Sequence, residues 1–254
     1  MKRLIAWPAL MVAGLFASVA AVQQAASPPP DLAAFDSEVI QARRLMRRAC
    51  GIAQELAAAQ APDTAKRAEA TRYINETRSQ WAAIQAKYAN ALSAAYAGDR
   101  TFASRLASVD ASMAQMISLL AANQPMAAAR QACGGACATL VAMHEENGLV
   151  YALDRLFHLR RTAMTTIAAG KTGGPGAIRE LVPELLHQRD RVLLAPCPNL
   201  TDAARCAEYR AALKEMSAAI DDLAARTVAG DREGTVEILN GLLAKINRTY
   251  GLAM

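Results

Sequence analysis

Hydrophobic residues recur at alternating spacings of three and four along the C-terminal part of the chain, in two sets separated by a short break. These sets are Tyr209, Leu213, Met216, Ile220, Leu223 and Thr227, and then Val236, Leu239, Leu243, Ile246 and Tyr250. Such spacing places each set on one face of a helix. At the break, Gly230 can adopt the left-handed conformation that ends a helix, and Asp231 can accept hydrogen bonds from the first N–H groups of the next one. The pattern predicts two antiparallel helices.

The same arrangement occurs earlier in the chain, because the four residues AGDR at 97–100 are found again at 229–232. The hydrophobic residues around the first copy are Trp81, Ile84, Tyr88 and Ala95, followed by Phe102, Leu106, Val109, Met113, Met116 and Leu120. A weaker similarity pairs the two arginines at 47–48 with those at 160–161. Together these similarities predict two unequal repeats of a helical bundle.

The residues that interrupt the pattern give the expected boundaries. The predicted elements are helices at 32–60, 65–97 and 99–123, a helical segment at 126–169 that bends or breaks at Gly134 and Gly135, a Gly-rich loop at 172–176, a short helix at 178–195, and the final hairpin from 201. Aromatic residues make up only 5% of the chain, and the 53% apolar fraction is rich in Ala, which favours close-packed helices over sheets. We therefore expect an all-α fold with two tandem antiparallel four-helix-bundle-like repeats, up-and-down, at 28–145 and 146–254.

The N-terminus has the features of an export signal. Lys2 and Arg3 precede an apolar run at 4–22, and small residues at 18 and 20 precede a suitable cleavage point. We expect residues 1–26 to be a signal peptide, the mature protein to be periplasmic or secreted, and no membrane span to remain after cleavage; a retained anchor is the alternative. Without Lys2 and Arg3, 26 basic residues (28 − 2) face 23 acidic ones, a net charge of +3 that is too balanced to indicate nucleic acid.

The final hairpin resembles the end of the periplasmic four-helix cytochromes, namely cytochrome c prime and its b-type relative. The residues that carry this resemblance are Ile220, Asp221, Asp222 and Leu223, then Ala229, Gly230 and Asp231, then Tyr250, together with the run ARRLM at 42–46. The family ligates haem iron with a His three residues before the final Tyr, and this chain has Asn247 there. Where covalent members have cysteines, it has Leu243 and Ile246. The resemblance therefore implies the scaffold without covalent haem.

This combination predicts an exported, non-enzymatic helical-bundle protein that serves as a binding or interaction module for an unidentified protein partner. We expect no catalytic residues and no cofactor, and a homodimer is one alternative for its oligomeric state. The second interpretation is a periplasmic metal- or haem-binding protein in electron transfer or metal handling. Its ligands would be Cys133, Cys137 and His144, which share one face of a helix and suit copper or zinc, or a histidine holding non-covalent haem. An oxidised Cys133–Cys137 pair, or inert core cysteines, is the alternative for those two residues.

The remaining cysteines and a group of arginines complete the candidates. Cys197 and Cys206 bracket a loop in a chain expected to be exported, so we expect a disulfide between them. Cys50 is then left unpaired, or bonded to a cysteine assigned elsewhere. A stripe of positive charge on the first helix is either a docking surface for an acidic partner or a solvated helix face. Its members are Arg43, Arg44, Arg47 and Arg48.

Overall fold

A computed structural model describes residues 30–89, 93–198 and 202–254. Within these ranges every regular element is helical, which confirms the all-α fold class. The expected signal peptide at 1–26 lies outside the described residues. No helix in the described ranges combines the length and the apolar character needed to cross a membrane.

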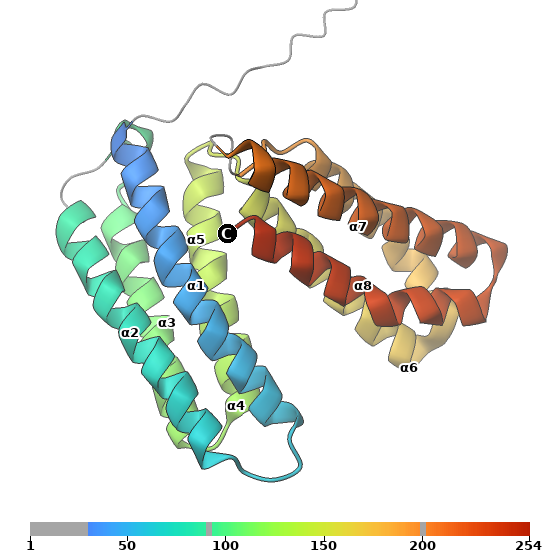
Figure 1. The fold of residues 1–254 in the computed structure, drawn as a ribbon, viewed down its shortest axis with the longest axis horizontal. Helices are drawn as coiled ribbons and strands as arrows, with labels where there is room; N and C mark the ends of the chain where they lie inside the picture. Colours follow the sequence, from blue (N-terminus) through green and yellow to red (C-terminus); the bar gives the residue numbers. More distant parts are fainter. Residues whose placement is uncertain (1–29, 90–92, 199–201) are drawn as a thin grey trace, which may run out of the picture.

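The first group of helices encloses one hydrophobic core. It consists of α1 (Pro30–Ala58), α2 (Thr64–Tyr88), α3 (Phe102–Ala121) and α5 (Gly134–Glu146), with the short elements η1 (Ala94–Tyr96), α4 (Pro125–Ala127) and the π-helix η2 (Ala128–Cys133). Figure 1 shows these helices side by side. The larger buried side chains of this core include Phe35, Trp81, Tyr96, Leu106, Met113 and Leu140.

The second group, α6 (Ala152–Leu193), α7 (Ala203–Ala229) and α8 (Arg232–Leu252), encloses a separate core (Figure 1). The backbone of α6 leaves helical geometry at Gly174, which has φ 69° and ψ −165°. Arg155 and Arg191, near its two ends, both form ion pairs with Glu145. On a straight helix they would be roughly 54 Å apart at 1.5 Å per residue. The chain therefore folds back at Gly174, and α6 contributes two arms to this group.

The final hairpin is capped as its sequence predicts. Gly230 has a left-handed φ of 73° after α7, and the carboxylate of Asp231 accepts a hydrogen bond from the Gly234 N–H at 3.0 Å. The earlier AGDR turn is built differently. Asp99 accepts from the Thr101 N–H at 2.8 Å and from the Asn147 side-chain amide at 3.0 Å, so it joins this turn to the end of α5.

Two of the expected boundaries are wrong. The second helix ends at Tyr88 and not at position 97, and the separate turn η1 then inserts Tyr96 into the core, with its ring 5.7 Å from Phe35 and 4.8 Å from Phe102. The pair Gly134 and Gly135 does not break the chain, because it lies in the first turn of α5, directly after the π-helix η2. The break comes at Gly148, whose φ is 72°.

The predicted buried positions of the final hairpin are correct in α7 and only partly correct in α8. All of the predicted α7 positions are buried. In α8, however, Leu242 is fully buried, Leu243 only half-buried, and Val236 is 50% exposed. The face that packs in the core is thus rotated by one residue near the middle of α8, because the helix contacts both α6 and α7 and not one neighbour alone.

We predict that Leu242→Asp lowers the free energy of unfolding by about 3 kcal/mol or more, because it places an unpaired charge in the second core. Val236→Asp is the matched control on the same helix and should change it by less than about 0.5 kcal/mol. Thermal and urea melts followed by circular dichroism measure both. Equal effects of the two substitutions would contradict this arrangement of α8.

Candidate binding site at the junction of the two helical groups

Three ionisable side chains meet in the interior where the two helical groups join. Arg43 of α1, His144 of α5 and Asp154 of α6 are exposed by only 4%, 5% and 1%. Asp154 Oδ1 lies 3.6 Å from Arg43 Nη1, and Asp154 Oδ2 lies 2.6 Å from His144 Nδ1. Buried charges are costly unless they are paired. Because Arg43 belongs to the first group and Asp154 to the second, this pairing holds the groups together.

Tyrosine hydroxyls extend this cluster to further helices. Arg43 Nη2 donates a hydrogen bond to the Tyr250 hydroxyl of α8 at 3.1 Å. Tyr151, just before α6, donates its hydroxyl to Asp36 Oδ2 of α1 at 2.6 Å, and its ring lies 4.6 Å from the His144 ring. Side chains of α1, α5, α6 and α8 are therefore connected in one network.

The two carboxylates of the network have opposite pKa shifts. Burial acts to raise the pKa of Asp154, but the hydrogen bond from His144 and the charge of Arg43 outweigh it, so this pKa lies below its ordinary value. Burial dominates at Asp36 and raises its pKa, although the hydrogen bond from Tyr151 opposes the shift. Asp154 is thus the firmly ionised partner of Arg43.

Hydrogen bonding in the cluster is incomplete among the described residues. His144 Nε2 and Asp154 Oδ1 are buried without a hydrogen-bond partner. The 3.6 Å separation from Arg43 Nη1 is a charge contact and too long for a hydrogen bond. Asp154 Oδ1 therefore depends on the Arg43 charge alone.

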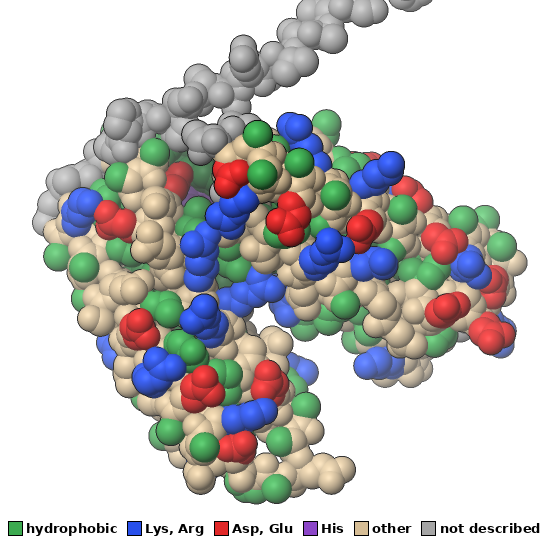
Figure 2. All heavy atoms as spheres, in the orientation of Figure 1, with side chains coloured by type: hydrophobic (Ala, Val, Ile, Leu, Met, Phe, Trp, Pro, Cys, Tyr) green, Lys and Arg blue, Asp and Glu red, His purple; other side chains and the backbone are tan. Residues whose placement is uncertain are grey.

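Further arginines lie along the outer side of this junction: Arg44, Arg47 and Arg48 of α1, and Arg160 of α6, which we call the junction arginines. Arg47 Nη2 donates to the main-chain oxygen of Asn247 at 3.0 Å, and Arg160 Nε donates to Asn247 Oδ1 at 2.8 Å. Arg44 donates to the main-chain oxygen of Met254. Figure 2 shows Lys and Arg side chains gathered where the two groups meet. The stripe predicted on the first helix is therefore not a uniformly solvated face.

The junction arginines have aromatic and main-chain neighbours in place of acidic ones. The Arg47 guanidinium lies 5.4 Å from the centre of the Tyr250 ring, and that of Arg48 lies 5.7 Å from the centre of the Tyr73 ring. In the described ranges, none of the junction arginines forms an ion pair with a side-chain carboxylate. The pKa of Arg47 is lowered, first by burial and further by the charge of Arg160, although Tyr250 opposes the shift. Positive charge is thus concentrated here without a side-chain carboxylate to compensate it.

The structure does not bring the predicted metal ligands together. Cys133 is bonded to Cys50, so its thiolate is not free to bind a metal in this oxidised form. Cys137 is the free cysteine and lies beside Arg43, and burial raises its pKa although Arg43 opposes the shift. His144 binds Asp154. The described part of the chain holds no group of three or more acidic, His or Cys side chains arranged for a metal.

The structure pairs four cysteines. Cys197 lies at bonding distance from Cys206, as expected. Cys50 pairs with Cys133, which is the alternative in which it is bonded to a cysteine assigned elsewhere. Cys50 and Cys133 are 83 residues apart in the sequence, and Cys197 and Cys206 are 9 apart. On the chain-entropy estimate these links contribute about 4.5 and about 2.5 kcal/mol. Cys50–Cys133 ties α1 to the segment just before α5.

We predict that peptide mapping without reduction finds the Cys50 peptide linked to the Cys133 peptide. Replacing Cys50 and Cys133 together by Ser should lower the free energy of unfolding by more than the same replacement of Cys197 and Cys206, because the longer loop restricts the unfolded chain more. Cys137 should be the cysteine that carries a free thiol. A Cys133–Cys137 link, or a free Cys50 thiol, would contradict this pairing.

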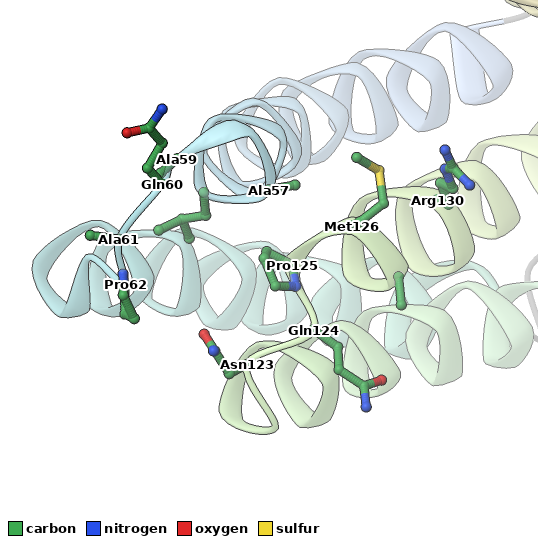
Figure 3. Close-up of a pocket in the computed structure, with 12 residues that line it drawn as sticks. Ala57, Ala59, Gln60, Ala61, Pro62, Asn123, Gln124, Pro125, Met126 and Arg130 are labelled. Atoms are coloured by element: carbon green, nitrogen blue, oxygen red, sulfur yellow. The ribbon is translucent and has the colours of Figure 1, made fainter. Parts of the chain in front are cut away.

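A shallow cleft lies at the far end of the first group, away from the junction. It has a volume of about 730 Å³ and lies between the end of α1, the loop at 59–62 and the segment at 123–127, with Arg130 at one side. Figure 3 shows Gln60 and Gln124 pointing away from Pro125, on opposite sides of it. The lining is mostly small apolar and amide side chains. It lacks the convergent charged groups of the junction.

Sequence reasoning missed Asp154 and Tyr151. The available signal was the acidic Asp154 between apolar neighbours Leu153 and Leu156, at a position that a helix start can bury. The resemblance to the cytochromes singles out Asn247 only as the position of an expected His, and in the structure its oxygens accept hydrogen bonds from two arginines.

Searches of protein families, curated proteins and solved structures found no match for this chain.

We predict that Asp154→Asn lowers the free energy of unfolding near neutral pH by about 3 kcal/mol, because it leaves the buried Arg43 charge unpaired. The folded pKa of Asp154 lies below the ordinary value of 3.8, so its stabilising effect is present above that pH and is lost as the pH falls through the folded pKa. Thermal melts at pH values from 7 downward should show that the variant loses less stability in acid than the parent.

Asp36→Asn is the control with the opposite sign. The pKa of Asp36 is raised in the folded state. Its contribution to the stability of the fold is therefore present below the ordinary value of 3.8 and is lost as the pH rises through the folded pKa. The free energy of unfolding of this variant should therefore rise relative to that of the parent at higher pH. If Asp154→Asn and Asp36→Asn change the loss of stability in acid equally, the Arg43–Asp154 pair does not determine that loss.

Proposed function

We propose that this protein is an exported, non-enzymatic binding module that uses the junction arginines to bind an anionic partner. In this proposal residues 1–26 direct export to the periplasm or outside the cell, and the scaffold is related to that of cytochrome c prime without covalent haem. The observation that carries the proposal is the concentration of Arg44, Arg47, Arg48 and Arg160 at one junction, without a side-chain carboxylate partner among the described residues.

The electrostatics of the junction supports binding of an anion. Like charges brought close together and partly removed from water repel one another, and an anionic ligand removes that repulsion. Arginine is suited to this task because its planar guanidinium stays charged and donates two parallel hydrogen bonds to an oxyanion. Arg44 and Arg48 are exposed, so their donors are accessible to a partner.

The arrangement of helices supports a division into two tandem bundles as part of the same proposal. Each group has its own core, and four helical segments surround each: α1, α2, α3 and α5 in the first, and the two arms of α6 with α7 and α8 in the second. This division makes the junction a place where a partner can contact both bundles. The junction arginines come from α1 in one bundle and α6 in the other.

We predict that the double variant Arg44→Glu with Arg48→Glu binds immobilised polyglutamate at least about tenfold more weakly than the parent at low salt. The matched control is Arg100→Glu with Arg210→Glu, which makes the same change in net charge at exposed positions outside α1 and α6. That control should retain most of the binding. An equal loss in both double variants would show that only net charge matters, and would contradict the proposal.

The alternative of a bound metal or haem is tested on the purified protein. A visible spectrum and elemental analysis should show neither a haem band nor a metal at stoichiometric amounts. A stoichiometric haem or copper signal would favour the electron-transfer or metal-handling interpretation over a module without a cofactor.

A further inference from the structure

Two of the junction arginines differ from the others because they converge on a single residue from different helical groups. Arg47 of α1 and Arg160 of α6 are both half-buried, and both donate to oxygens of Asn247 in α8. We propose that Arg47 and Arg160 together bind one phosphate group at the junction. This inference rests on the proposed function and names the chemistry of its ligand.

The donors needed for a phosphate are present and unused. A guanidinium carries five N–H donors. Arg47 spends one of its donors on the Asn247 main-chain oxygen, and Arg160 spends its Nε–H on Asn247 Oδ1. Their remaining N–H groups have no acceptor among the described residues. Asn247 therefore fixes the two side chains next to each other and leaves their other donors for a ligand.

The α8 groups that contact Arg47 are neutral. Arg47 lies against the Tyr250 ring and beside Gly251, where an added Cβ would come within 3.2 Å of Arg47 Nη1. The buried carboxylate of the junction, Asp154, is already shared by Arg43 and His144. The lowered pKa of Arg47 has the Arg160 charge among its causes, so the two cations are close enough to repel each other. A bound anion would remove this repulsion.

The geometry favours phosphate over a carboxylate. A carboxylate has two oxygens, which a single guanidinium fork can satisfy. A tetrahedral phosphate has enough oxygens to accept from two forks that approach from different sides, as arginines from α1 and α6 do. Arg44 and Arg48 lie within one turn of Arg47 on α1 and are exposed, so they can contact further negative charge on a larger phosphate compound or at a lipid surface.

The test has two arms that separate the two sources of a phosphate group. In the first, sodium phosphate is titrated into the mature chain by isothermal calorimetry, with sodium chloride at matched ionic strength as reference. In the second, co-sedimentation compares phosphatidylcholine vesicles with vesicles that also contain phosphatidylglycerol. We expect saturable binding of one phosphate per chain, preference for the anionic vesicles, or both. A response to phosphate alone identifies a free phosphate compound, and a response to the anionic vesicles alone identifies a lipid headgroup.

Neighbouring arginines provide the matched variants. Arg160→Gln should weaken the observed binding about tenfold or more, as expected for the loss of a charge-assisted hydrogen-bonded pair. Arg161→Gln removes the same charge from the next, exposed residue, whose guanidinium lies over the Phe157 ring, and it should have little effect. Arg160→Lys keeps the charge without the fork and should restore only part of the affinity. Circular dichroism melts confirm folding, and Arg160→Lys replaces Arg160→Gln in the comparison if the latter is unfolded.

Two results would overturn the inference. One is the absence of binding above the chloride reference together with equal sedimentation of both vesicle types. The other is an equal loss of binding in the Arg160 and Arg161 variants, since this would show a response to net charge. If polyglutamate is still bound in a manner that depends on Arg44 and Arg48, the phosphate site fails while the proposed function stands. Loss of both responses would remove both proposals.

Discussion

The ion pair between Arg43 and Asp154 is the interaction on which the relative placement of the two helical groups depends. Both side chains are almost fully buried, and they come from α1 and α6, on opposite sides of the junction. Removing either charge from water is costly, and only the other charge, with the hydrogen bonds from His144 and to Tyr250, compensates for it. An arrangement that keeps both residues buried but shifts one group relative to the other would leave these charges unpaired.

Local sequence patterns predicted most of the helices because residues close in the sequence determine where these helices form and end. The buried face of α7 follows from a repeat of three and four residues, and the turn at Gly230 and Asp231 follows from the backbone preferences of those two residues. The prediction errors occur where a contact between residues far apart in the sequence determines the local structure. Tyr96 enters the core beside Phe35, which is far away in sequence, and this contact produces a separate turn where periodicity alone suggested a continuous helix.

The candidate site was only partly visible in the sequence for the same reason. The four arginines at 43–48 were recognised as a stripe, but helical periodicity does not say whether a polar face meets water or another helix. Here that face meets α8 through Asn247, Tyr250 and Met254. Cys137 and His144 are both close to the Arg43–Asp154 pair. Cys133, by contrast, is directed to Cys50, a contact across 83 residues that spacing cannot reveal.

The constraint at Arg43 also accounts for the charge concentration next to it. Once Arg43 is fixed against Asp154 and Tyr250, the pitch of α1 places Arg47 one turn further along the same face, against α8. Arg160 approaches the same residue of α8 from α6, whose position the Asp154 contact sets. Repulsion between Arg47 and Arg160 is therefore a consequence of how the two groups are joined. A ligand that binds only when both arginines are in place would stabilise the joined arrangement by mass action, so binding at the junction and association of the two groups are thermodynamically coupled.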